Sequence, residues 1–264
     1  MARPTPTFQP RSAWPWAWAG CLVGLLGAAL LFAPARWLAA GVERATDGRL
    51  QLRDARGTVW TGSAELALTG GPGSADTASL PDRVDWRLRP RWDGVRAELS
   101  TACCTTQPLA LRAHWGFAGQ VIQVADAQSQ WPAALLAGLG TPWNTLQFDG
   151  DLILSTQSLS VEWAQGRLSI SGQAELRAQR LSSRLSTLRP MGSYRITVLG
   201  GATPTLQLET LEGALQLGGS GQWVGSRLRF SGTASAAPDS ESALSNLLNI
   251  IGRRSGPRSL ISIG

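Results

Sequence analysis

The sequence predicts a mostly β protein, in which an N-terminal transmembrane helix is followed by an antiparallel β-sheet-rich domain with short helices. Three observations predict this arrangement. An uncharged apolar stretch lies between Arg11 and Arg36, apolar and polar residues alternate after residue 40, and 30 glycines and 15 prolines separate the alternating runs. Hydrophobic residues make up 43% of the 264 residues, which excludes a chain that is disordered throughout.

The composition excludes several kinds of chemistry. All 24 basic residues are arginines, so reactions that need a lysine, such as Schiff-base formation or phosphate binding by a P-loop, are ruled out. One histidine cannot build a histidine-rich metal site, and three cysteines are too few for a disulfide framework in a chain of this length. The basic excess lies on the polar faces of the predicted strands without a base-stacking motif, so we expect no nucleic-acid partner.

The apolar stretch has the length of a membrane span. As a helix, residues 14–33 would extend about 30 Å, which matches the hydrocarbon core of a bilayer. The side chains expected to hold this anchor in the bilayer are Trp14, Trp18, Leu22, Leu25, Leu26, Leu30, Leu31 and Phe32. We therefore divide the chain into a tail over residues 1–12, a transmembrane anchor over 13–35 and a β-rich domain over 36–264.

A cleaved signal peptide is the alternative interpretation of this stretch. Ala33-Pro-Ala35 resembles a cleavage site, but Arg36 follows it directly and the apolar run is long for a signal peptide. An uncleaved anchor is therefore favoured. Arginines lie on both sides of the stretch, so the positive-inside rule does not decide which end faces the cytoplasm.

The remainder of the chain alternates with the period of a β-strand. Runs such as residues 84–88, 159–163 and 194–198 place apolar side chains on one face and polar side chains on the other. Such runs recur roughly every 8–12 residues and are separated mostly by glycine or proline, which is typical of an antiparallel sheet.

A short pattern recurs three times along this region. It consists of an apolar residue, a serine or threonine, a glycine, any residue and an alanine, and its glycines are Gly62, Gly172 and Gly232. A glycine inside a strand usually marks a bulge or a bend, so we expect each copy to bend a long strand. Chance recurrence in a chain rich in alanine and glycine is the alternative.

A helix is predicted over residues 240–251. Asp239 or Ser240 can cap its N-terminus, and Gly252 follows its last turn. Its apolar stripe consists of Leu244, Leu247, Leu248 and Ile251. We expect this stripe to pack on the sheet, and the alternative is that it faces a partner or the membrane surface. A shorter helical piece is predicted over residues 132–137.

No group of residues predicts a catalytic or metal site. His114 lies in an alternating run with no nucleophile motif near it, and the acidic residues lack the spacing of a calcium loop. Cys103 and Cys104 are adjacent, and free thiols are favoured because a bond between neighbours strains the peptide. A bond between them or to a partner in an oxidising compartment is the alternative. We therefore expect a protein that is not an enzyme and needs no cofactor and no metal.

Several short segments, taken in order, resemble one protein family. They are Gly57-Thr-Val-Trp60-Thr-Gly62-Ser-Ala64, Trp131-Pro-Ala-Ala-Leu-Leu-Ala-Gly-Leu-Gly-Thr-Pro-Trp143, Leu146-Gln-Phe-Asp-Gly150-Asp-Leu-Ile-Leu154, Pro190-Met-Gly-Ser-Tyr194, Leu211-Glu-Gly213-Ala-Leu-Gln-Leu217, Phe230-Ser-Gly232-Thr-Ala234 and Ala243-Leu-Ser-Asn-Leu-Leu-Asn-Ile-Ile-Gly252. Their order and spacing, after a short N-terminal apolar stretch, resemble protein N of the bacterial type II secretion system. Cys103 and Cys104 match no motif of that family.

The resemblance implies a single-pass protein of the bacterial inner membrane, with a short cytoplasmic tail and its bulk in the periplasm. It implies a non-enzymatic component that supports export of folded proteins from the periplasm across the outer membrane. The implied partners are other subunits of the type II secretion system and the lipids of the inner membrane. The resemblance brings no catalytic residue with it.

A second function is compatible with the alternating strands and the bend-forming glycines. A long curled sheet with an apolar concave face, tethered at the inner membrane, would shield acyl chains from water. A periplasmic lipid-handling β-groove module, with a lipid ligand, is therefore the alternative to a scaffolding subunit. A closed interior filled by side chains would indicate the scaffold, whereas an open apolar groove would indicate the lipid module.

Overall fold

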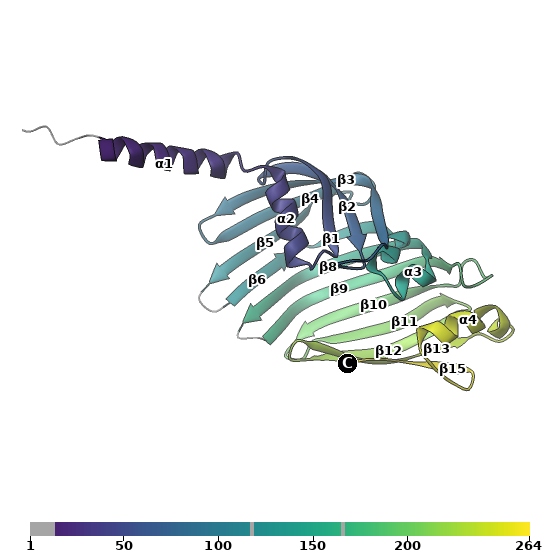
Figure 1. Cartoon of the computed structure of the whole chain (residues 1–264). Helices are drawn as coiled ribbons and strands as arrows, with labels where there is room; N and C mark the ends of the chain where they lie inside the picture. Colours follow the sequence, from purple (N-terminus) through teal and green to yellow (C-terminus); the bar gives the residue numbers. More distant parts are fainter. Residues whose placement is uncertain (1–13, 117–118, 165–166) are drawn as a thin grey trace, which may run out of the picture.

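The computed structural model describes residues 14–116, 119–164 and 167–264 (Figure 1). The predicted tail over residues 1–12 lies outside the described residues. The described chain forms one long curved antiparallel sheet, with helices packed along it and one helix that projects away from its N-terminal end (Figure 1). The prediction of a mostly antiparallel β protein with short helices is confirmed.

The helices are short and lie mainly at the two ends of the chain. They are α1 (Trp14–Leu31), α2 (Ala35–Ala45), the 3₁₀-helix η1 (Ala133–Leu139), α3 (Trp143–Leu146) and α4 (Glu241–Ile251). Helix α4 begins one residue after the predicted start, and η1 replaces the helical piece predicted over 132–137. Among the described residues, no helix combines the length and apolar character needed to cross a membrane, so a span over residues 13–35 is not supported.

The strands form one continuous antiparallel meander. They are β1 (Leu50–Gly57), β2 (Thr61–Thr69), β3 (Thr77–Arg91), β4 (Gly94–Thr101), β5 (Leu109–Gly116), β6 (Gly119–Val124), β7 (Ala127–Pro132), β8 (Phe148–Ala164), β9 (Arg167–Ser183), β10 (Gly192–Gly201), β11 (Thr205–Gly213), β12 (Leu215–Val224), β13 (Arg227–Ala236), β14 (Arg253–Ser255) and β15 (Arg258–Ile263). In the sheet of 15 strands, each strand pairs with the next strand of the chain, with two exceptions. Strands β6 and β7 both pair with β8, and β15 pairs with β13, so that β14 lies at the edge beside β15. The sheet is open, because β1 and β14 end its two sides.

One face of this sheet carries most of its apolar side chains. Directly paired residues share a face, so rows of paired residues show which side chains lie together. One row of direct pairs is Ala113, Ile122, Val161 and Ile170, across β5, β6, β8 and β9. A second row is Val198, Leu206, Gly221, Phe230 and Ile263, from β10 to β15. The residues between them on the same strands, such as Gln123, Ser160 and Ser171, form a polar row on the opposite face.

The main core lies where α4 covers the apolar face. Leu244 and Leu247 are fully buried and Leu248 is 1% exposed, in a cluster with Tyr194 and Leu215. Burying a leucine side chain contributes about 1.5–3 kcal/mol, so the apolar stripe of α4 is held on the sheet. Burial also raises the pKa of Tyr194, whose hydroxyl donates a hydrogen bond to the Leu215 carbonyl.

The alternative that this stripe faces a partner is therefore wrong. Leu244, Leu247 and Leu248 are inaccessible, and Ile251 is half-buried against the same cluster. The reason is that the stripe lies directly over an apolar part of the sheet that would otherwise be exposed to water.

Two smaller clusters fix the N-terminal half of the sheet. Ala35 of α2, which the sequence did not predict as a helix, packs with the buried residues Ala64 and Trp86. Leu135 of η1 packs with Leu80 and with Cys104. Together with the α4 cluster, these contacts place helices over both ends of the chain's path through the sheet.

Cys103 and Cys104 are joined by a disulfide, so the favoured prediction of free thiols is wrong. That prediction rested on the strain that a bond between neighbouring residues places on the peptide. The structure places the pair in a turn after β4, where the Cys104 amide donates to the Thr101 carbonyl. Both sulfur atoms meet in this turn, and Cys104 is buried beneath η1.

The three repeat glycines occupy two kinds of position. Gly172 has a φ of 81° and lies opposite an irregularity of β8, where a Cβ atom would come within 2.2 Å of the Ser158 carbonyl oxygen. A Cβ at Gly62 would lie 2.4 Å from the Arg56 carbonyl oxygen and 2.6 Å from the ring of Trp86, and one at Gly232 would lie 2.8 Å from the Gly218 carbonyl oxygen and 2.9 Å from the ring of Phe230. These two glycines therefore make room for both a neighbouring strand and an aromatic ring, whereas Gly172 serves a bulge.

We predict that Leu247→Ala lowers the free energy of unfolding by about 2–5 kcal/mol, because it leaves a cavity in the α4 cluster. The matched control is Ile250→Ala on the same helix, where the side chain is 41% exposed. The control should cost about 1 kcal/mol or less. Urea unfolding followed by tryptophan fluorescence measures both values, and an equal loss in the two variants would contradict the placement of α4.

Candidate functional site

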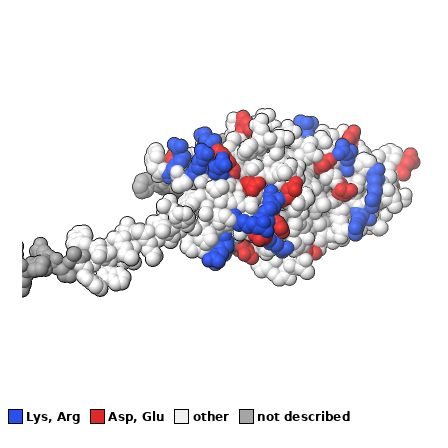
Figure 2. Space-filling view, turned by 90° about the horizontal axis from the view of Figure 1, so that it is seen from above, with Lys and Arg blue, Asp and Glu red and all other residues white. Residues whose placement is uncertain are grey.

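The surface of α1 is apolar on every side. The exposed fractions are Trp14 71%, Trp16 82%, Trp18 59%, Leu22 58%, Val23 71%, Leu25 64%, Leu26 65%, Leu30 64% and Leu31 66%, with Phe32 at 75% just after the helix. The helix contains no charged residue, and Figure 2 shows it as an uncharged rod beside the charged surface of the domain. The residues predicted to form the anchor therefore share one uncovered apolar surface.

The end of α1 is fixed to the first turn of the sheet. The indole nitrogen of Trp60 donates to the Leu30 carbonyl at 2.8 Å, and the Val59 amide donates to the Ala33 carbonyl at 2.8 Å. Pro34 forms an isolated bridge with Thr58. These contacts give the helix a defined direction relative to the sheet rather than a free linker.

The helices leave part of the apolar face of the sheet uncovered. Trp115, Ile122, Trp163 and Ile263 lie on this face and are 56%, 46%, 50% and 55% exposed. Trp115 and Trp163 are both paired with Gln120, so the exposed region crosses three neighbouring strands at the same level. The interior that the sequence left undecided is therefore an open apolar face and not a closed core in this region.

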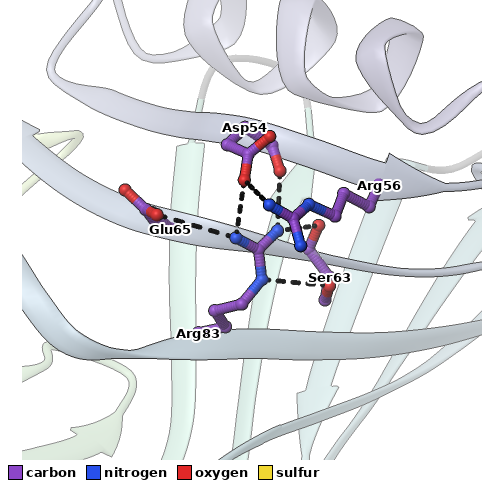
Figure 3. A network of polar contacts seen from close by, with 5 residues as sticks. All are labelled: Asp54, Arg56, Ser63, Glu65 and Arg83. Carbon is purple, nitrogen blue, oxygen red and sulfur yellow. Dashed lines mark hydrogen bonds and ion pairs between the residues drawn. The ribbon is translucent and has the colours of Figure 1, made fainter.

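A polar network ties the first three strands together (Figure 3). The Asp54 carboxylate accepts from Arg56 Nη2 at 2.6 Å and from Arg83 Nη1 at 3.0 Å. Arg83 also donates to the Asp54 carbonyl, to the Ser63 hydroxyl and to the Ser63 carbonyl, and its Nη1 lies 3.6 Å from Glu65. One guanidinium thus joins β1, β2 and β3.

This network depends on a bulge in β1. The register of β1 against β2 shifts between Arg53 and Arg56, and Asp54 has a φ of 48° there. Aspartate tolerates this conformation better than most residues, and the bulge turns its side chain toward Arg83. Hydrogen bonds from Arg56 and then from Arg83 hold the pKa of the Asp54 carboxyl below its usual value. A bulge and alternating charges also protect an edge strand from unwanted pairing.

The described residues contain no group of three or more histidine, cysteine, aspartate or glutamate side chains that could hold a metal ion. His114 Nδ1 lies 3.2 Å from Asp93 Oδ2, beside the turn between β3 and β4. The surface features described above are the apolar helix α1, the uncovered apolar face and the charged strands around it.

A family model described as Type II secretion system (T2SS), protein N matches residues 48–260. The chain belongs to this family. No curated protein and no solved structure gives a significant match. The match extends from just before β1 into β15, so it covers the sheet, its repeat glycines and α4, whereas α1 and α2 precede it.

The family resemblance found in the sequence is confirmed, but the Asp54–Arg83 network was not predicted. Asp54 and Arg83 are 29 residues apart, and the β1 bulge that joins them leaves no clear mark in the sequence. Glu65 and Arg83 carry opposite charges and pair directly, but this pairing can be recognised only when the register of β2 against β3 is known.

We predict that Asp54→Asn removes a pH-dependent part of the stability. Because the pKa of Asp54 is lowered in the folded state, its contribution is present above the unfolded pKa and is lost as pH falls through the lower folded value. Urea midpoints measured from neutral pH into the acid range should therefore converge for the unchanged protein and the variant. The control, Asp82→Asn, removes the same charge from an exposed position of β3, and identical profiles for both variants would contradict the prediction.

Proposed function

We propose that this chain is a non-enzymatic component of the type II secretion system that supports export of folded proteins from the periplasm across the outer membrane. The single observation that carries the proposal is the family match over residues 48–260. The sheet with its exposed edges and faces suits non-covalent contacts with other subunits of the system.

In this proposal, the N-terminal apolar segment holds the sheet at the periplasmic side of the inner membrane. Support comes from the side chains of α1, which are exposed and apolar on all sides, and from the hydrogen bond between Trp60 and Leu30 that fixes the helix to the domain. A helix of this character in water would expose a large apolar surface, which marks sites of membrane or protein contact.

The two edges of the sheet differ as places for a partner strand. Strand β1 carries a bulge and the charges of Arg53, Asp54 and Arg56, which disfavour pairing. On β15, residues 258–260 pair with β14, whereas residues 261–263 pair with β13 alone among the described residues. We therefore place strand addition by another secretion subunit at residues 261–263.

The test combines secretion with site-specific photocrosslinking in cells. A photoreactive amino acid at Ser262 should capture another secretion subunit. The same group at Ser220 should capture none. Ser220 pairs with Ser231 of β13, which pairs with Ser262, so Ser220 lies on the same face of the sheet but two strands from its edge. Removal of the chain should leave folded cargo in the periplasm. Unchanged export would overturn the proposal, and equal capture at both positions would overturn the edge contact.

A second function, a lipid-handling groove tethered at the inner membrane, is favoured by the open apolar face. Trp163 is 50% exposed and Ile122 is 46% exposed, although both lie on the face that α4 covers elsewhere. Ile122 of β6 pairs directly with Val161 of β8, so the apolar surface continues from one strand to the next. Such a surface can shield acyl chains from water.

Lipid extraction from the purified protein, followed by mass spectrometry, tests this second function. Val161→Asp should lower bound lipid about 100-fold, because an aspartate among acyl chains costs about 3 kcal/mol. Ser171→Asp places the same charge on the opposite face of the sheet, on the neighbouring strand β9, and should leave bound lipid unchanged. Absence of lipid from the unchanged protein would exclude the groove, as would an equal loss in both variants.

A further inference from the structure

Three arginines face one another across the neighbouring strands β3, β4 and β5. Arg89 of β3 pairs directly with Arg96 of β4, and Arg96 pairs directly with Arg112 of β5. Like charges placed directly opposite one another destabilise a sheet. This row lies on the polar face, because the partner of Arg112 on β6 is Gln123. The arrangement calls for a compensating negative charge.

The acidic side chains near the row compensate it only in part. Arg96 Nη2 lies 3.3 Å from Glu98, and Asp93 is shared by Arg91 at 3.5 Å and His114 at 3.2 Å. Within the described chain, neither Arg89 nor Arg112 has a carboxylate oxygen within 4.0 Å.

One polar atom of the row lacks a partner, and the surface is hollowed beside the row. The Nε atom of Arg96 and the Oδ1 atom of Asp93 are buried and have no hydrogen-bond partner in the described structure. A cavity of about 310 Å³ is lined by four basic side chains and by Asp93; the basic ones are Arg91, Arg96, Arg112 and His114. A second hollow of about 450 Å³ adjoins it and is also lined by Arg96 and Arg112. Both volumes are large enough for a phosphate group.

The row lies beside tryptophans at the ends of two hairpins. Trp92, in the turn between β3 and β4, is 94% exposed, and Trp115, at the end of β5, is 56% exposed. In Figure 1, the turn between β3 and β4 and the C-terminal end of β5 lie on the side toward which α1 extends. Tryptophan prefers the interface between a bilayer and water, so this end of the sheet has the composition of a surface that meets a membrane.

We propose that Arg96 and Arg112, which line both hollows, bind the phosphate of an anionic phospholipid at the bilayer surface, with Trp92 and Trp115 at the level of the headgroups. Guanidinium groups form bidentate hydrogen bonds with phosphate oxygens, and the exposed guanidinium of Arg112 has no carboxylate partner among the described residues. The headgroup supplies the negative charge that the row lacks. This inference rests on the proposed position of the domain beside the inner membrane.

The test places the full chain in nanodiscs of pure phosphatidylcholine or of phosphatidylcholine mixed with phosphatidylglycerol. Hydrogen–deuterium exchange is followed in peptides that cover residues 89–97 and 110–116. We expect exchange there to slow at least about fivefold in the anionic discs, the effect of one arginine at an anionic surface. Equal exchange in the two kinds of disc would overturn the inference.

Paired variants separate the site from general charge. Arg96→Gln combined with Arg112→Gln should abolish the difference between discs, and Arg254→Gln combined with Arg258→Gln should preserve it. Removing facing like charges should leave the Tm of the first variant unchanged or higher, whereas a lower Tm would indicate that these arginines serve folding and would overturn the proposal.

Two further arms identify the source of the phosphate and test the anchor. Inorganic phosphate added to neutral discs should not slow exchange, and slowing equal to that in anionic discs would assign the site to a soluble anion instead.

Co-elution of the chain with the discs reports the anchor, which Leu25→Arg with Leu26→Arg should abolish. Failure of the unchanged chain to co-elute would contradict anchor and headgroup site together, whereas co-elution without an exchange difference would contradict the site alone.

Discussion

The structure depends on a mismatch between one long apolar face and the few helices that cover it. Alternation along antiparallel strands sends most apolar side chains to the same side of the sheet. The sheet remains open, so this face cannot be buried against itself, as it would be in a closed barrel. Helices α2, η1 and α4 cover parts of it through three separate clusters. Where they stop, apolar side chains such as Trp163 remain exposed.

This mismatch leaves the distinctive features of the molecule on its surface. Burial fixes the sheet under α4, while the hairpin ends away from that helix carry exposed tryptophans on one face and arginines on the other. The C-terminal strands thus bury apolar side chains under α4, whereas β3, β4 and β5 leave tryptophans and arginines exposed at their ends. Membership of the protein N family is consistent with such a division, because an assembly component works through its surfaces.

The polar face follows a different rule, because charge and not burial organises it. In the Asp54 network, opposite charges from three strands meet and stabilise the edge of the sheet (Figure 3). In the arginine row, like charges meet and oppose folding. Such local conflicts are expected where side chains serve a ligand, which is the role that we propose for this row.

The sequence by itself determined most of the strands and helix α4, and which residues of each regular strand segment share a face. Alternation is a local property, so residues 159–163 and 194–198 were assigned to strands, and the spacing of Leu244 and Leu247 predicted α4. Tertiary structure alone decided whether that helix packs inward, where the apolar face stays open, and which charges meet. These depend on register between distant strands: Arg89 and Arg112 meet only through Arg96, and Asp54 reaches Arg83 only because a bulge turns it. The tertiary structure also decided the disulfide between Cys103 and Cys104, because a turn and not a strand holds the pair.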